Sequence, residues 1–220
     1  MPNDNIVLGI EVLQKRLRFV ATDLAPNVLA QEEIQFNHRL SNKNLLIEVS
    51  NVVQKCLNQF ATKTVLGVAV ALPGLIDSDN GKILFSSKLV TSELNLASAL
   101  SGNFNNVRFE VLNDANAGAI GLRYYHKSGL EYKNIIYATL NENAQNIGYG
   151  FIINGQLYTG ATGIAGESQL LWPSIESYIV SLLPAFTNTP TQLYFLKKKV
   201  CILKIYCILP KKVVHWPLQY

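Results

Sequence analysis

The chain has 220 residues, of which 49% are hydrophobic and only 15% are charged. This composition excludes an intrinsically disordered protein, and the length allows one large domain or two small ones. Three cysteines, Cys56, Cys201 and Cys207, are too few and too scattered for a disulfide framework. The chain does not open on a basic segment followed by an apolar run, so the sequence predicts a cytoplasmic protein without a signal peptide.

The positive charge of the chain lies at its end. The net charge is +4, and residues 173–220 contribute six lysines against one glutamate, or +5, which leaves −1 for residues 1–172. A basic tail on a nearly neutral body gives little support for a nucleic-acid surface on the folded part. The longest apolar run of the tail is interrupted by Lys204 and is shorter than the ~20 residues that span a bilayer, so no membrane span is expected.

The first third of the chain predicts a meander of three strands followed by a helix. Apolar runs separated by turn residues predict antiparallel strands over 6–10, 17–24 and 28–36. Apolar residues at helical spacing predict a helix over 44–60, capped by Ser41 or Asn42.

The next part of the chain predicts alternating strands and helices. Residues 65–72 are almost continuously apolar, which is typical of a parallel strand covered on both faces, and Pro73-Gly74 ends the strand. Further elements are predicted as a helix over 93–100, a strand over 107–112, a helix over 114–126 and strands over 134–140, 147–153 and 156–158. Asn154-Gly155 predicts a hairpin between the last two strands. This order indicates an α/β fold.

Two carboxylates stand where ligand chemistry is expected. Asp114 follows Asn113 at the end of a predicted strand, facing the crevice where open α/β sheets bind ligands. Asp is also favoured as a helix cap, so a structural role explains the same position. Glu167 closes the glycine-rich segment 160–167 and could accept hydrogen bonds from two neighbouring hydroxyls, or be a solvated loop residue. Position alone leaves these alternatives open.

Three segments in this order, Leu72-Pro-Gly, Asn113-Asp-Ala-Asn and Gly160 to Glu167, resemble the sugar-binding core of the ROK family. That family contains sugar kinases and sugar-responsive transcriptional repressors. The resemblance covers residues 5–172 and implies an α/β fold with a ribonuclease-H/actin-like domain of the sugar kinase type over 1–119. It further implies the start of an incomplete second α/β domain over 120–172, followed by a divergent basic tail over 173–220.

The resemblance also implies which residues bind the ligand, a small sugar or amino sugar. The expected sugar contacts are Gly74, Lys88, Asn113, Asp114 and Glu167. Lys88 stands where the family often has an asparagine, which changes the set of hydrogen-bond donors. In a kinase of this type, Asp114 would take the proton from the attacking hydroxyl as general base.

Departures from the family's kinase pattern argue against nucleotide binding. The kinases begin with an aspartate followed by paired glycines, whereas this chain has Gly9-Ile-Glu11, as repressors commonly do, and long or branched side chains up to Arg18. Of the second phosphate loop, only Gly148 and Gly150 are kept. We therefore expect neither ATP nor Mg²⁺ as cofactor. No zinc is expected either, because Leu170 replaces the zinc-site histidine and no closely spaced cysteine pair occurs.

These observations favour a sugar-sensing domain of a ROK-type transcriptional regulator without kinase activity. The first alternative is an ATP-dependent hexose kinase that uses Asp114 as base. The second is an inactive truncated product, whose first domain would lack the family's covering helix. Apolar surface exposed in that way would favour a homodimer.

This chain alone is not expected to read DNA sequence. The family's repressors carry a winged helix-turn-helix ahead of the sugar domain, whereas the first predicted strand here begins at Ile6. Gel-shift titration with operator-length duplexes should therefore give only weak, salt-sensitive binding. A sequence-selective shift that resists salt would contradict this expectation.

Overall fold

The fold was obtained as a computed structural model, which describes residues 4–86, 88–89, 91–125, 129–140, 147–161, 163–166, 203–209 and 212–213. The chain divides into two compact units, residues 1–114 and 115–220. The sequence analysis placed the start of the second domain at residue 120, inside the helix that opens the second unit. Within the described ranges, no helix is long and apolar enough to cross a membrane.

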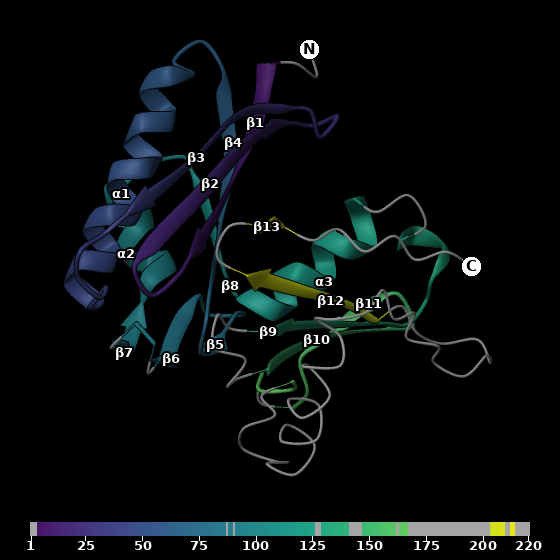
Figure 1. The fold of residues 1–220 in the computed structure, drawn as a ribbon. Helices are drawn as coiled ribbons and strands as arrows, with labels where there is room; N and C mark the ends of the chain where they lie inside the picture. The colour runs from purple at the N-terminus through teal and green to yellow at the C-terminus, as the bar shows by residue number, and fades with distance from the viewer. Residues whose placement is uncertain are drawn as a thin grey trace. The chain divides into compact units, whose positions relative to one another are not determined.

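The first unit is built on a five-stranded sheet with the order β3-β2-β1-β4-β8 (Figure 1). The strands are β1 (Asn5–Val12), β2 (Arg16–Asp23), β3 (Val28–Gln35), β4 (Thr64–Leu72) and β8 (Arg108–Asn113). β1, β2 and β3 form the antiparallel meander that was predicted, whereas β4 and β8 extend the sheet in parallel to β1. The parallel strands follow helices because parallel neighbours need a crossover connection.

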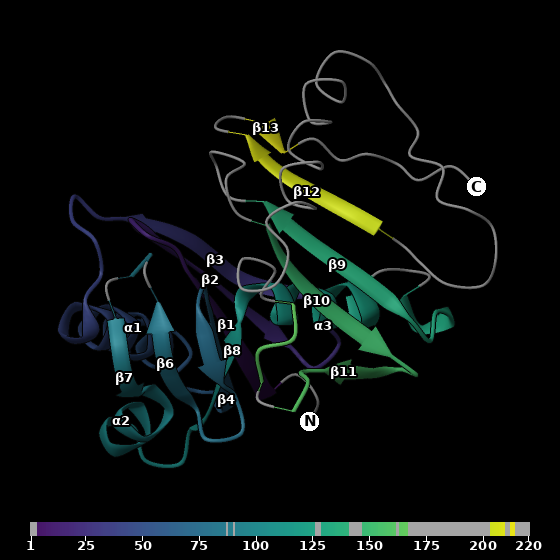
Figure 2. The same ribbon diagram turned by 90° about the horizontal axis from the view of Figure 1, so that it is seen from below.

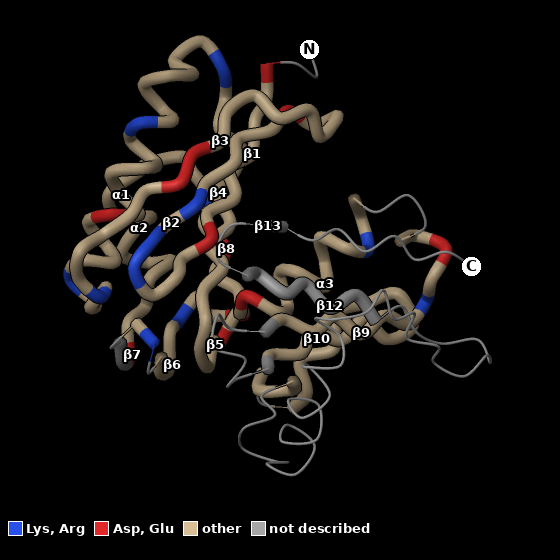
Figure 3. The backbone as a smooth tube through the Cα atoms, viewed as in Figure 1, with Lys and Arg blue, Asp and Glu red and all other residues tan. Residues whose placement is uncertain are grey.

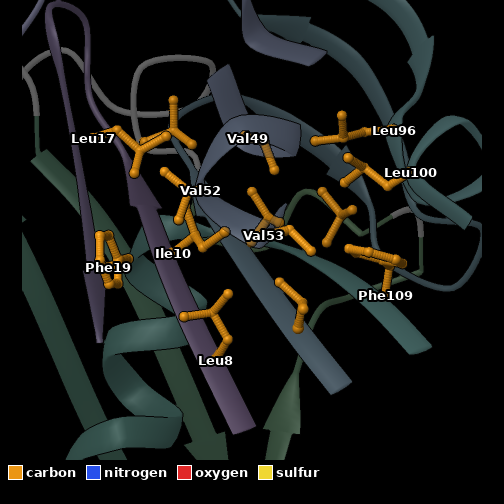
Figure 4. Close-up of a cluster of buried hydrophobic side chains, with 14 of the residues drawn as sticks. Leu8, Ile10, Leu17, Phe19, Val49, Val52, Val53, Leu96, Leu100 and Phe109 are labelled. Atoms are coloured by element: carbon orange, nitrogen blue, oxygen red, sulfur yellow. The ribbon is translucent and has the colours of Figure 1, made fainter. Parts of the chain in front are cut away.

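One face of this sheet carries the main hydrophobic core. Helices α1 (Asn42–Gln59) and α2 (Leu96–Asn103) supply apolar side chains that pack on alternate residues of the strands (Figure 4). β1 shows the pattern clearly, because Ile6, Leu8, Ile10 and Val12 are buried and the residues between them are only half-buried. Ser41 is the N-cap of α1, as predicted, although its side chain makes no capping hydrogen bond.

The other face of the sheet differs from expectation. The apolar run of β4 predicted burial on both faces, but Leu66 is 45% exposed and Ala69 is exposed as well. The reason is that α1 and α2 both pack on the opposite face of the sheet (Figure 2). β4 is a parallel strand, as predicted, but only one of its faces is covered by the helices of its own unit.

A small antiparallel sheet follows β4. Its strands are β5 (Leu75–Asp77), β6 (Lys82–Ser86) and β7 (Thr91–Asn95), which lie side by side in this order (Figure 1). The helix predicted over 93–100 therefore begins too early, because residues 93–95 belong to β7 and α2 begins at Leu96. Asn95 fixes this boundary, since its side-chain oxygen accepts a hydrogen bond from the Ser98 N–H at 2.9 Å.

The second unit has its own sheet, with the order β11-β10-β9-β12-β13. Its elements are α3 (Asp114–Tyr125, which begins at the unit boundary), a 3₁₀ turn (Gly129–Glu131), β9 (Ile135–Leu140), β10 (Ile147–Ile153), β11 (Gln156–Tyr158), β12 (Leu203–Leu209) and β13 (Lys212–Val213). The predicted hairpin at Asn154-Gly155 is confirmed, and both residues have positive φ. A small core forms where Ala119 and Leu122 of α3 meet Ile135 and Ile152 of the sheet.

Part of the basic tail belongs to this sheet. Residues 173–220 have no clear periodicity, so no element was predicted there, yet Leu203–Leu209 form β12, which pairs in parallel with β9. The apolar run around Lys204 is thus a strand at this point of the tail, where the sequence suggested no element.

The core of the first unit predicts a contrast between two positions of α1. Leu45→Ala should lower the free energy of unfolding by about 2–5 kcal/mol, because the Leu45 side chain is fully buried. Ile47→Ala, on the same helix with 44% exposure, should cost less than about 1 kcal/mol. Urea denaturation followed by circular dichroism measures both, and equal losses would contradict the described packing of α1.

Candidate functional site

The site is built at the carboxyl ends of the three parallel strands of the first unit. Glu11 of β1 is paired in register with Ala71 of β4, and Leu72 of β4 with Asn113 of β8. These pairings align the last residues of β1, β4 and β8 at one edge of the sheet. Ligands of open α/β sheets bind outside this edge, because the connections that leave the strands there supply backbone and side-chain contacts.

Asn113 and Gly74, which were predicted as sugar contacts, are joined directly. The Asn113 side-chain amide donates a hydrogen bond to the Gly74 carbonyl oxygen at 3.1 Å, and Asn113 is 9% exposed. Gly74 has φ +136°, and a Cβ atom there would meet the Phe85 carbonyl and the Ser86 side chain. The turn after β4 is thus fixed between the end of β8 and the end of β6, and it requires glycine.

Lys88 lies two residues beyond this packed segment. The buried Ser86 hydroxyl accepts a hydrogen bond from the Leu89 N–H at 3.3 Å, which shapes the turn that contains Lys88. Lys88 is half-buried. It therefore lies two residues after Ser86, against which Gly74 packs.

Asp114 is the first residue of α3 and follows Asn113 directly. A carboxylate in the first turn of a helix is stabilised by the helix dipole, in agreement with the capping role considered from sequence. Its negative charge also acts on Glu11, whose pKa it raises. The end of β8 and the end of β1 are thus electrostatically coupled.

Glu11 lies at this end of the strands and was not among the residues that the sequence analysis singled out for ligand contact. Desolvation by burial raises the pKa of its carboxyl, with Arg18 opposing this effect and Asp114 adding to it. One signal was available from sequence: Glu11 ends the first strand, and a strand that pairs in parallel with 65–72 brings its end to the same edge. Gly9-Ile-Glu11 had been used only as a sign of the repressor branch.

The turn after β1 lacks the backbone features that bind a phosphate anion. The Leu13 N–H donates to the Arg16 carbonyl at 2.8 Å, so this backbone donor is used within the turn. No residue between Leu13 and Lys15 has positive φ. A backbone cradle for phosphate needs successive N–H groups that point outward, usually with alternating signs of φ.

The glycine-rich loop of the second unit is anchored on β10. The Tyr149 N–H donates to the Gly166 carbonyl at 3.2 Å, and the Ala165 N–H donates to the Thr159 carbonyl at 3.0 Å. Gly166 has φ +95°, and a Cβ atom there would collide with the Tyr149 carbonyl. Glu167, the predicted sugar contact that follows, lies outside the described residues.

The described ranges contain no group of three histidine, cysteine, aspartate or glutamate side chains that could hold a metal ion. Leu170, where a zinc-site histidine was considered, lies outside those ranges, as do residues 141–146 of the second phosphate loop.

Comparison with known proteins gives a consistent result. A model of the ROK family matches residues 7–168. The xylose repressor of Bacillus spizizenii is 30% identical over 168 residues, which cover 73% of this chain and 40% of the repressor. The N-acetylglucosamine repressor of Escherichia coli O157:H7 is 25% identical over 162 residues, which cover 73% of this chain and 38% of that protein. The chain thus spans about two fifths of these curated relatives.

Solved structures show the same fold. A ROK family transcriptional regulator, a homologue of the E. coli MLC protein, superposes with a TM-score of 0.65 at 20% identity, covering 76% of this chain and 41% of that one. A ROK family glucokinase from Streptomyces griseus, solved with glucose and AMPPNP, gives a TM-score of 0.63 at 20% identity, covering 74% and 49%. The predicted α/β fold of the ROK family is confirmed, and the chain spans half or less of each of these structures.

The geometry at Gly74 predicts a local cost for any side chain. Gly74→Ala should lower the free energy of unfolding by about 1–3 kcal/mol, because the backbone is strained for alanine and its Cβ atom meets the Phe85 carbonyl. Gly102→Ala in α2 is the matched control, since nothing lies within 4 Å of its Cβ position. That change should stabilise the helix by about 1 kcal/mol or less. Thermal unfolding measures both, and a neutral Gly74→Ala would contradict the described turn.

Proposed function

The chain belongs to the ROK family, and from this premise we propose that it is a sugar-binding domain of repressor type that does not transfer phosphate. The observation that carries the proposal is the arrangement at the carboxyl edge of β1, β4 and β8. There the Asn113 amide is held against the Gly74 carbonyl, and Asp114 follows at the start of α3.

This arrangement suits a polyhydroxylated ligand. A carboxylate accepts hydrogen bonds from neighbouring hydroxyls, and an amide both donates and accepts. Because Asn113 is tied to the turn at Gly74, its side chain is oriented before a ligand arrives, which reduces the entropy lost on binding. We propose Gly74, Lys88, Asn113, Asp114 and Glu167 as the sugar contacts.

The turn between β1 and β2 supports the absence of ATP chemistry. A triphosphate needs outward-pointing backbone N–H groups and close approach. Here the Leu13 N–H is bonded within the turn, and side chains from Leu13 to Arg16 replace the glycines of the kinases. Neither Mg²⁺ nor zinc is part of the proposed function.

The named relatives suggest which sugars to try. Two of them are named xylose repressor and N-acetylglucosamine repressor. The ROK family match over residues 7–168 includes all the proposed sugar contacts. We propose a pentose or an amino sugar as the ligand. We also propose that a longer protein containing this domain acts in sugar-dependent regulation.

A hexose kinase is the second candidate, and one observation favours it. Asp114 lies at the end of a parallel strand, where a general base for a sugar hydroxyl would be placed. ATP consumption in the presence of glucose tests this alternative. Turnover that Asp114→Asn lowers by at least about 10²-fold would establish it in place of the sensing role.

Calorimetric titration with xylose, N-acetylglucosamine, N-acetylmannosamine and glucose tests the proposed function. At least one of these sugars should bind, and Asp114→Asn should weaken its affinity by about tenfold or more, because a hydrogen bond to a charged acceptor is lost. Asp79→Asn, in the exposed turn between β5 and β6, is the matched control and should leave the affinity unchanged. Absence of binding by all four sugars would contradict the proposal.

A further inference from the structure

A row of charged side chains crosses the sheet next to the proposed sugar site. Glu33 of β3, Arg18 of β2 and Glu11 of β1 are successive cross-strand partners. The Arg18 Nε donates to a Glu33 carboxylate oxygen at 2.6 Å, and the Arg18 Nη1 donates to a Glu11 carboxylate oxygen at 3.3 Å. The alternation of acidic and basic residues on these strands is visible along the backbone in Figure 3.

The inner end of this row lies at the carboxyl ends of the parallel strands. In the register of the sheet, Glu11 aligns with Ala71 of β4 and Leu112 of β8, so these three side chains share one face of the sheet. Asn113 alternates to the other, helix-covered face, and Asp114 follows two residues after Leu112. Glu11 is thus at the same end of the strands as Asp114, on the face that the helices of its unit leave uncovered.

We propose that Glu11 is a further sugar-binding residue and that Arg18 is the residue that positions it. This inference rests on the proposed function. Glu33 holds the Arg18 guanidinium from one side, and the guanidinium then orients the Glu11 carboxylate and favours its ionised form. An ionised carboxylate accepts hydrogen bonds through both oxygens, which is the complement of two adjacent sugar hydroxyls.

Electrostatics explain why Glu11 needs such a partner. Burial disfavours the charged form of Glu11, and the Asp114 carboxylate adds to that effect, so the pKa of Glu11 is above its ordinary value. The charged groups that oppose protonation are Arg18 and, to a smaller extent, Arg16, both on β2. Without Arg18, Glu11 would bind a proton at a higher pH and lose half of its acceptor capacity.

The sign of the pH effect follows. Because the sugar is held by the ionised carboxylate, affinity is complete above the pKa of Glu11 and falls as the pH drops through it. The loss approaches about tenfold per pH unit below that point when one proton competes with the ligand. Removing Arg18 should make the sugar affinity begin to fall at a higher pH. Removing the Glu11 charge should abolish the pH dependence of affinity that Glu11 causes.

The test is calorimetric titration between pH 5 and pH 8 with whichever of xylose, N-acetylglucosamine, N-acetylmannosamine and glucose binds the unchanged chain. Glu11→Gln should weaken binding at pH 8 by about tenfold, with a flatter pH profile. Arg18→Met should bind nearly as well as the unchanged chain at pH 8, and its affinity should begin to fall at a higher pH than that of the unchanged chain. Arg18→Lys should keep the original profile, because the positive charge is retained.

Arg108→Met is the matched control. Arg108 pairs with Glu110 on β8, but its side chain is 80% exposed and lies at the amino end of that strand. Its profile should be that of the unchanged chain. If Arg18→Met does not give the circular dichroism spectrum of a folded chain, Arg18→Gln carries the same test.

The outcomes separate the two proposals. If none of the four sugars binds the unchanged chain, the proposed function fails and this inference fails with it. If a sugar binds and Glu11→Gln binds it equally well at every pH, only the role of Glu11 is refuted. If Arg18→Met loses affinity equally at pH 6 and pH 8, Arg18 supports the fold and does not set the charge of Glu11.

Discussion

The parallel pairing of β1 with β4 and of β4 with β8 is the constraint on which the site depends. This register places Glu11, the turn at Gly74, and Asn113 with Asp114 at one edge of one sheet, although more than a hundred residues separate the first from the last. A shift of one residue in any pairing would turn the alternate side chains to the other face. The buried faces of β1 and β8, packed on α1 and α2, hold that register. The packing that stabilises the core therefore also sets the geometry of the candidate site.

Polar and charged groups near the end of β1 are paired with other groups of the same chain. The Leu13 N–H is used inside the turn after β1, and Arg18 is shared by Glu11 and Glu33. The first contact occupies a backbone donor of the kind that a phosphate cradle needs, and the second holds the Glu11 carboxylate in place.

Much of the fold could be predicted from the sequence because its signals are local. The meander, the 18 residues of α1, and the hairpin at Asn154-Gly155 follow from alternation, helical spacing and turn chemistry. The predicted start of α2 was wrong. The helical pattern begins at residue 93, but capping by Asn95 makes the helix begin after it. The exposure of Leu66 was missed, because a run of apolar residues does not show how many faces a domain covers. β12 was missed, because its partner β9 lies more than sixty residues earlier in the chain.

The candidate site was predictable only in part. Gly74, Asn113 and Asp114 lie in short segments that could be recognised in the sequence. The structure adds the hydrogen bond between Asn113 and Gly74. Glu11 could not be assigned in the same way, since its role depends on cross-strand partners in β2 and β3 and on Asp114 across the sheet. Such relations are set by register, which single-sequence patterns do not give.

The most direct measurement of the central claim is a map of ligand contacts on the unchanged chain. Amide chemical shifts of the ¹⁵N-labelled chain would be followed while xylose, and separately N-acetylglucosamine, is added. The account predicts that the largest shifts for a binding sugar occur at Glu11, Gly74, Asn113 and Asp114. Largest shifts on the outer strand β3 or on α1, with these four residues unchanged, would contradict it.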